Sequence, residues 1–241
     1  MRSGNPVLND RAFERGAYGP EAMTLEGTVN KAFIMLVLLG AGAFVAWDRY
    51  FAGTLEPGLV IGSAIVGLLL AFAIVFVRRA APFLAPVYAV AEGIVVGGVS
   101  AAYETQFSGI TLQAVLLTAA VFLALLFAYK TRLIQATRNF KLGVFAATVG
   151  IAIMYLLSFV LGFFGISVPY LHDNSLIGIG ISLFIVAIAA LNLVLDFDFI
   201  ESGVRSGAPK YMEWYGAFGL LVTLIWLYFE ILRLLSKLRS R

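Results

Sequence analysis

Seven segments of the chain are long and apolar enough to cross a lipid bilayer, and this pattern constrains the fold more than any other feature. A helix needs about 20 apolar residues to span a hydrocarbon core of about 30 Å. A β-barrel would instead show apolar and polar residues in alternation, which is absent here. The sequence therefore predicts an all-α, polytopic membrane protein, a seven-transmembrane-helix bundle within residues 29–238. The predicted spans lie near residues 31–48, 58–77, 82–103, 110–129, 143–164, 175–195 and 212–235.

The composition excludes other classes of protein. Of 241 residues, 61% are hydrophobic and only 13% are charged, about half the charge of a soluble domain. The absence of cysteine excludes zinc fingers and disulfide scaffolds. The single histidine, His172, is predicted in a loop, which argues against serine hydrolases and intramembrane proteases. We therefore expect no enzyme, no bound cofactor and no nucleic-acid partner; basic loops account for the net charge of +3.

Basic residues are concentrated in alternate loops, and this asymmetry predicts the orientation. Cytoplasmic loops of membrane proteins carry an excess of Lys and Arg, so the N-terminus is predicted to be cytoplasmic, and residues 1–28 form a polar, flexible tail there. The opposite loops hold only Arg49. The C-terminal cluster Arg233, Lys237, Arg239 and Arg241 disagrees, because seven spans place it outside; either the earlier clusters override it or the last segment is re-entrant, and we favour seven full spans. The cytoplasmic set comprises Arg2, Arg11, Arg15, Lys31, Arg78, Arg79, Lys130, Arg132, Arg138, Lys141, Arg205 and Lys210.

The third span carries a carboxylate at membrane depth. Glu92 lies ten residues past Pro82, about 15 Å along a helix and near the middle of the bilayer. Tyr88, one turn earlier, shares its face and is placed to hydrogen-bond it. Glu92 is either a protonated lock between helices or a proton- or cation-binding group on a pathway. Gly93 and Gly97 in the same span form a small-residue pair that favours close helix packing.

Acidic residues also gather at the end of the sixth span, in LNLVLDFDFIESG. Asn192 and Asp196 share a face, whereas Asp198 points to the other side of the helix with Glu201. Close carboxylates repel, and a shared proton or cation relieves the repulsion. We therefore expect Asp196 and Asp198 to form a proton-sensing or metal-binding site, with Asn192 and Glu201 supporting it.

The last span is bounded by two further acids. Glu213, beside an interfacial aromatic pair, is a candidate member of the proton-sensing or ion-pathway group. Glu230 lies near the opposite face and is expected to pair with Arg233, three residues on. In none of the spans is a Lys or Arg predicted at depth, so buried acids are expected to lack basic neighbours.

The chain resembles the Bax inhibitor-1/YccA family, over about residues 28–238. The resemblance is carried by PVYAVAEGIVVGGVSAAYE, by LNLVLDFDFIESG and by GAPKYMEWYGAFGLLVTLIWLYFEILRLLSKL, and these segments are similar to the actinobacterial-type branch. It implies a bacterial cell membrane location and six helices around a central seventh. It also implies a pH-sensitive calcium leak, latched by two aspartates that share a proton.

Asp196 matches the first aspartate of that latch. The second would fall near Val222 or Thr223, neither of which ionises. We infer, apart from the resemblance, that Asp198 or Glu213 could substitute for it. The resemblance thus predicts a cation leak channel, with Ca²⁺ as permeant ion in a lipid bilayer. The alternatives are an interaction protein that modulates a membrane partner such as a membrane-bound protease, through its N-terminal tail, and a transporter coupled to Glu92.

Overall fold

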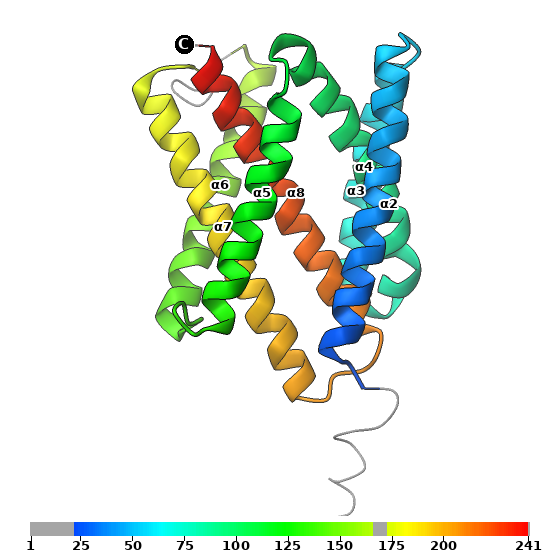
Figure 1. Cartoon of the computed structure of the whole chain (residues 1–241), viewed down its shortest axis with the longest axis vertical. Coiled ribbons are helices and arrows are strands. Elements are labelled where there is room, and N and C mark those ends of the chain that lie inside the picture. Colours follow the sequence, from blue (N-terminus) through cyan, green and yellow to red (C-terminus); the bar gives the residue numbers. More distant parts are fainter. Residues whose placement is uncertain (1–21, 166–172, 241) are drawn as a thin grey trace, which may run out of the picture. The chain divides into compact units, whose positions relative to one another are not determined.

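The computed structural model describes residues 22–165 and 173–240. The predicted tail lies largely, and His172 entirely, outside these residues. The described chain is helical and contains no strand, only an isolated bridge between Ala22 and Pro209. Its elements, labelled in Figure 1, are α2 (Leu25–Phe51), α3 (Pro57–Phe76), the 3₁₀ turn η1 (Arg78–Ala80), α4 (Ala81–Gln106), α5 (Ile110–Lys130), α6 (Arg138–Phe163), α7 (Leu176–Arg205) and α8 (Met212–Arg239).

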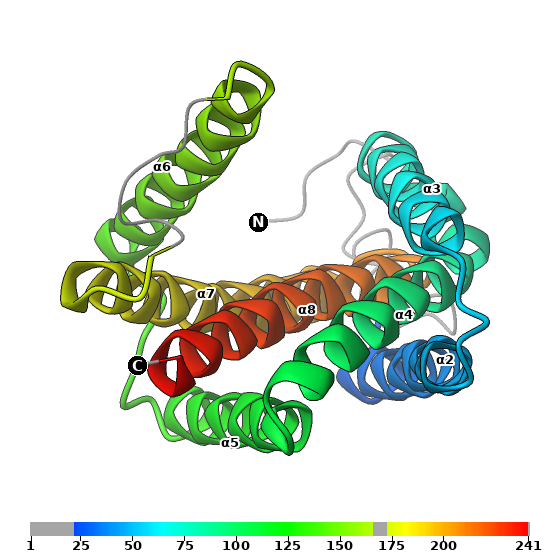
Figure 2. The same ribbon diagram turned by 90° about the horizontal axis from the view of Figure 1, so that it is seen from above.

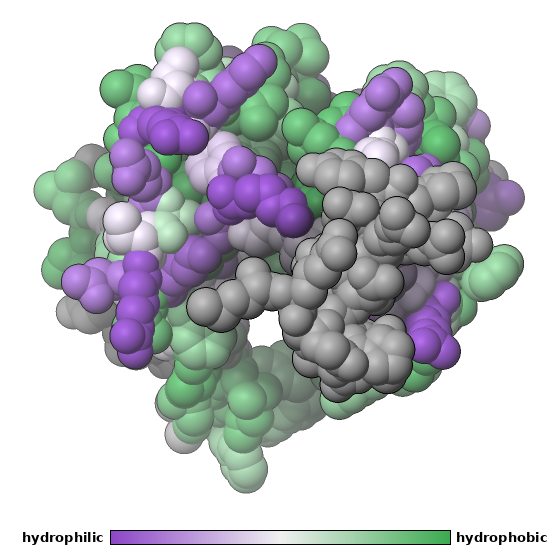
Figure 3. Space-filling model, turned by 90° about the horizontal axis from the view of Figure 1, so that it is seen from below, coloured by the Kyte–Doolittle hydropathy of each residue, from purple (hydrophilic) through white to green (hydrophobic). Residues whose placement is uncertain are grey.

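Seven of these helices, α2 to α8, are long and apolar enough to cross a membrane. The prediction of an all-α, seven-span membrane protein is confirmed. Large apolar side chains such as Phe76, Phe83 and Phe163 are exposed, and hydrophobic residues cover wide areas of the surface seen in Figure 3. Large exposed apolar areas mark surfaces that contact a membrane or another protein, and a membrane-facing surface agrees with the length and hydropathy of these helices. Half of the apolar window of α8 is buried, as in α4 and more than in the other spans.

Local sequence sets the helix ends. Pro57 opens α3 in the first turn, where its missing N–H has no partner to lose. The Thr137 hydroxyl caps α6 by accepting a hydrogen bond from the Phe140 N–H. Gly207, at a φ of +66°, closes α7 in the left-handed conformation that glycine tolerates best. α7 thus continues past the predicted end at Leu195 as far as Arg205, because nothing in the acidic segment interrupts a helix.

Contacts within the chain divide it into two compact units. The first unit includes residues 22–44, 56–95 and 198–221, and the second includes residues 45–55, 96–165, 173–197 and 222–240. In the second unit α7 and α8 lie side by side (Figure 1 and Figure 2), and Lys237 of α8 donates to the Gly178 carbonyl of α7 at 3.1 Å. The apolar core of this unit joins Ile151 of α6 to Ile185 and Ile188 of α7.

In the first unit, α2 and α4 approach each other at glycines. A Cβ placed on Gly42 would lie 2.5 Å from the Val90 carbonyl oxygen, and one on Gly93 would meet the carbonyl oxygen of Leu39. The backbones of the two helices are therefore in direct contact at this crossing, as small residues permit in membranes.

Candidate functional site

Asp196 lies in the second unit, where it faces α8. Its carboxylate makes a side-chain hydrogen bond with Thr223, while its Oδ2 atom is buried and has no hydrogen-bond partner. No basic side chain pairs with Asp196 in the described part of the chain. Thr223 is one of the two residues near which the resemblance places a second aspartate, and its hydroxyl is the group that meets Asp196 there.

Asn192, one helical turn before Asp196 on α7, adds a further polar side chain to this region. Its Nδ2 atom donates to the Thr148 hydroxyl of α6 at 2.8 Å and to the Ile188 carbonyl oxygen at 2.9 Å. Helices α6, α7 and α8 thus each contribute a polar side chain to one region of the second unit: Thr148, Asn192 with Asp196, and Thr223.

Asp198 and Glu201 belong to the first unit. Asp198 is half-buried, whereas Glu201 is exposed and pairs with Arg205 at 3.7 Å. Asp196 and Asp198, the two predicted metal ligands, both lie within α7 (Leu176–Arg205), two residues apart, so their side chains leave the helix about 200° from each other. Within residues 22–165 and 173–240, no group of three or more His, Cys, Asp or Glu side chains could hold a metal ion.

Glu92 lies in the first unit, with its carboxylate directed at α3. A Cβ on Gly67 would collide with the Glu92 Oε1 atom, so Gly67 leaves the room that this carboxylate occupies. No hydrogen bond joins Glu92 to Tyr88 among the described residues. The buried Tyr88 ring instead packs edge-on against Phe218 of α8, with ring centroids 4.9 Å apart.

Glu213 differs most from expectation, because it is fully buried and yet has two basic partners. Lys31 of α2 lies 2.7 Å from its Oε2 atom, and Lys210 lies 2.8 Å from its Oε1 atom. The backbone N–H and the hydroxyl of Thr24 also donate to Oε1, each at 2.9 Å. The expectation that a buried acid lacks a basic neighbour is wrong here, because α2 begins at Leu25 and places the half-buried Lys31 beside Glu213.

The segment before Lys31 is shaped around this carboxylate. A Cβ on Gly27 would collide with the carboxyl group of Glu213, and the Met23 N–H donates to the Ala208 carbonyl oxygen at 2.7 Å. We call residues 22–31 with Glu213 and Lys210 the N-terminal clasp. Sequence reasoning missed Thr24 and Gly27 because nothing in a polar N-terminal segment indicates a contact almost 190 residues away.

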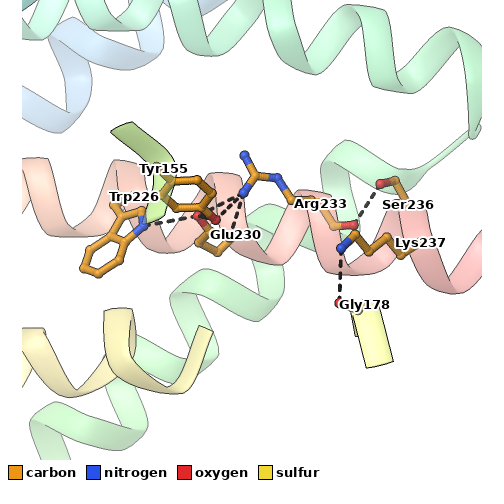
Figure 4. Close-up of polar contacts among 7 residues, drawn as sticks. All are labelled: Tyr155, Gly178, Trp226, Glu230, Arg233, Ser236 and Lys237. Atoms are coloured by element: carbon orange, nitrogen blue, oxygen red, sulfur yellow. Dashed lines mark hydrogen bonds and ion pairs between the residues drawn. The ribbon is translucent and has the colours of Figure 1, made fainter. Parts of the chain in front are cut away.

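Glu230 lies in the second unit at the centre of a polar network (Figure 4). It is only 2% exposed. Its Oε1 atom accepts hydrogen bonds from the Tyr155 hydroxyl at 2.8 Å and from the Trp226 Nε1 atom at 3.2 Å. Arg233 lies 3.3 Å from Oε2, in the ion pair that the sequence predicted, and its guanidinium stacks over the Tyr155 ring at 5.1 Å.

A further buried polar pair joins α4 to α8 in the second unit. The hydroxyls of Ser100 and Tyr228 are 2.6 Å apart. Both residues are neutral and lie inside long apolar segments, so hydropathy gives no sign that they meet. Two acids of this unit, Glu230 and Asp196, differ in their partners. Glu230 forms an ion pair with Arg233, whereas Asp196 has a hydrogen bond with the Thr223 hydroxyl alone. Of these two acids, Asp196 alone lacks a basic partner among the described residues.

Comparison with known proteins identifies the family of the chain. Comparison with curated proteins and with solved structures returns no match. The sequence model of the family described as Bax inhibitor 1 like matches residues 5–240, nearly the whole chain. The motifs that surround Asp196 and Glu213 lie within this match. This chain, an integral multi-pass membrane protein, therefore belongs to the Bax inhibitor 1-like family.

Proposed function

We propose that this protein is a pH-sensitive cation leak channel that passes calcium and is gated by protonation of Asp196. The observation that carries the proposal is the buried Oδ2 atom of Asp196, which has no hydrogen-bond partner on a helix that spans the membrane. An ionised carboxylate without a compensating partner costs several kcal/mol at membrane depth. Asp196 therefore favours a proton, a cation or water beside it.

The two protonation states would have different effects on the packing of α7 and α8. A neutral carboxyl can remain between the helices and share a hydrogen bond with Thr223. A charged carboxylate draws water and a cation towards it, and its oxygens are the ligands that Ca²⁺ prefers. We therefore expect the flux to rise as the pH rises and Asp196 loses its proton.

The proposal also covers the membrane in which the protein lies and its orientation across that membrane. The basic loops favour a cytoplasmic N-terminus, which would place Asp196 towards the cytoplasmic end of α7. The family resemblance favours a bacterial cell membrane. We propose neither an enzymatic activity nor a resident cofactor.

Calcium uptake into proteoliposomes tests this proposal. The purified protein is reconstituted with a calcium-sensitive dye inside the vesicles, and flux is measured across a pH series. We expect Asp196→Asn to abolish the pH dependence, because the amide cannot ionise. Asp48→Asn is the matched control: it makes the same change at an exposed acid of α2, and its pH profile should equal that of the wild type.

Two results would contradict the proposal. A wild-type protein that passes no calcium at any pH would exclude the leak, and an unchanged pH profile in Asp196→Asn would exclude this gate. The first result would favour the interaction protein, for which deletion of residues 1–26 should remove a partner from a pull-down.

A further inference from the structure

In the second unit, a layer of apolar side chains separates two groups of polar side chains, which we call the first and second polar levels. The first contains Asp196 and the second contains Glu230, and α8 carries residues of both. Thr223, which contacts Asp196, is followed by Trp226 and then by Glu230 with Arg233. Thr223 and Glu230 are seven residues apart, so they lie on nearly the same face of the helix, about 10 Å from each other along its axis. Trp226 lies between them and packs against the apolar core.

Helix α6 repeats this order. Thr148 bonds to Asn192 in the first polar level, Ile151 follows in the core, and Tyr155 bonds to Glu230 in the second polar level. Thr148 and Tyr155 are also seven residues apart, again about 10 Å. Two helices therefore give the same thickness for the apolar layer.

Helix α7 crosses the layer in the opposite direction. Asp196 and Asn192 are at the first polar level, Ile188 and Ile185 are in the core, and the Gly178 carbonyl accepts the Lys237 ammonium beyond it. Ile185 is 1% exposed and Ile188 is 8% exposed. The residues of the layer on α6 and α7 are thus closed off from the surface, since Ile151 is also only 5% exposed, whereas Trp226 of α8 is half-buried.

We propose that Ile151, Ile185, Ile188 and Trp226, the apolar layer, form the closed barrier of the leak. This inference rests on the function proposed above, because it assigns the barrier that the Asp196 gate would open. Hydrophobic constrictions stop ions by excluding the water that would hydrate them. On the face of α8 that carries Thr223 and Glu230, an ion at Asp196 must pass about 10 Å of apolar side chains to reach the Glu230 carboxylate. The buried Ser100–Tyr228 pair lies on another face of α8.

Glu230 has a positioning role in this arrangement. It accepts a hydrogen bond from the Trp226 Nε1 atom and is itself fixed by Tyr155 and Arg233. Figure 4 shows the indole and the Arg233 guanidinium on either side of the Glu230 carboxylate. The indole therefore cannot swing out of the layer without breaking its bond to a buried carboxylate.

A polar substitution within the layer tests the barrier. We expect Ile185→Ser to raise calcium flux in proteoliposomes about tenfold or more at both ends of the pH series, which corresponds to a barrier lower by about 1.4 kcal/mol or more. Ile185→Val keeps the layer apolar and should raise the flux far less than Ile185→Ser does. Ile153→Ser is the matched control, because Ile153 lies on α6 but is 52% exposed, outside the layer.

The outcomes separate this inference from the gate proposal. If folded Ile185→Ser, judged by its elution profile and melting temperature, leaks no faster than the wild type, the barrier is elsewhere, and the result for Asp196→Asn still stands. If Ile153→Ser leaks equally, loosened packing explains the flux, and the inference is overturned. If Ile185→Ser leaks while the wild type shows no pH response, the barrier is supported and the Asp196 gate fails. Ile188→Thr provides a second, milder variant should Ile185→Ser not fold.

The positioning role of Glu230 has a spectroscopic readout. With Trp47 and Trp214 replaced by Phe, Trp226 is the sole indole of the chain. We expect Glu230→Gln to make its fluorescence more accessible to a soluble quencher and to raise the leak. Unchanged quenching in a folded Glu230→Gln protein would contradict the role.

Discussion

Gly27 lies where any larger residue would collide with a buried carboxylate. We predict that Gly27→Ala destabilises the protein by about 1–3 kcal/mol, the usual cost of an overpacked site, as measured by thermal unfolding in detergent. Gly40→Ala is the control on the same helix, because nothing lies near a Cβ at that position. Gly40→Ala should be neutral or slightly stabilising, since alanine favours helices more than glycine. Equal melting temperatures for the two variants would show that Glu213 moves aside freely.

Glu213 itself is predicted to act on stability rather than on the flux. Glu213→Gln removes the charge that compensates Lys31 and Lys210, and the loss of charged hydrogen bonds at a buried acceptor costs about 2 kcal/mol or more. Glu201→Gln, which weakens an exposed ion pair with Arg205, should cost less than about 1 kcal/mol. Urea unfolding in mild detergent compares the two. If Glu213→Gln unfolds at the same urea concentration as the wild type but changes the pH dependence of the calcium flux, Glu213 takes part in gating instead.

At the scale of single elements, hydropathy predicts the helices but not their ends. Apolar runs of about 20 residues identify each span, whereas α7 continues through Asp196, Asp198 and Glu201 until Gly207 stops it. The acids of this segment therefore lie within a helix rather than at its terminus. α2 likewise begins at Leu25, before the predicted span, because the N-terminal clasp holds its first turn.

The candidate site could be predicted only in part, for a related physical reason. Acids stand out in an apolar sequence, so Asp196, Glu92 and Glu230 were identifiable. Their partners were not, because neutral residues such as Thr223 and Trp226 give no signal within apolar runs. Contacts between distant parts of the chain depend on how the helices pack, which periodicity does not report.

At the scale of the whole molecule, the proposed orientation can be tested because the chain has no cysteine. A single cysteine can therefore be introduced in any loop without other changes. We predict that a cysteine at Gly53, between α2 and α3, reacts with an impermeant reagent added to intact cells. A cysteine at Ser206, between α7 and α8, should react only after the membrane is permeabilised. The reverse pattern would invert the topology and the side from which Asp196 is reached.

The contact of α2 with α4 at Gly42 and Gly93 has a mechanical consequence. At this crossing no side chain lies between the two backbones, so a change of side-chain rotamer cannot let one helix shift against the other. We therefore expect the contact between α2 and α4 to be rigid. If the protein opens, we expect the movement to occur at helix contacts formed by flexible side chains, with the crossed parts of α2 and α4 moving together as one rigid body.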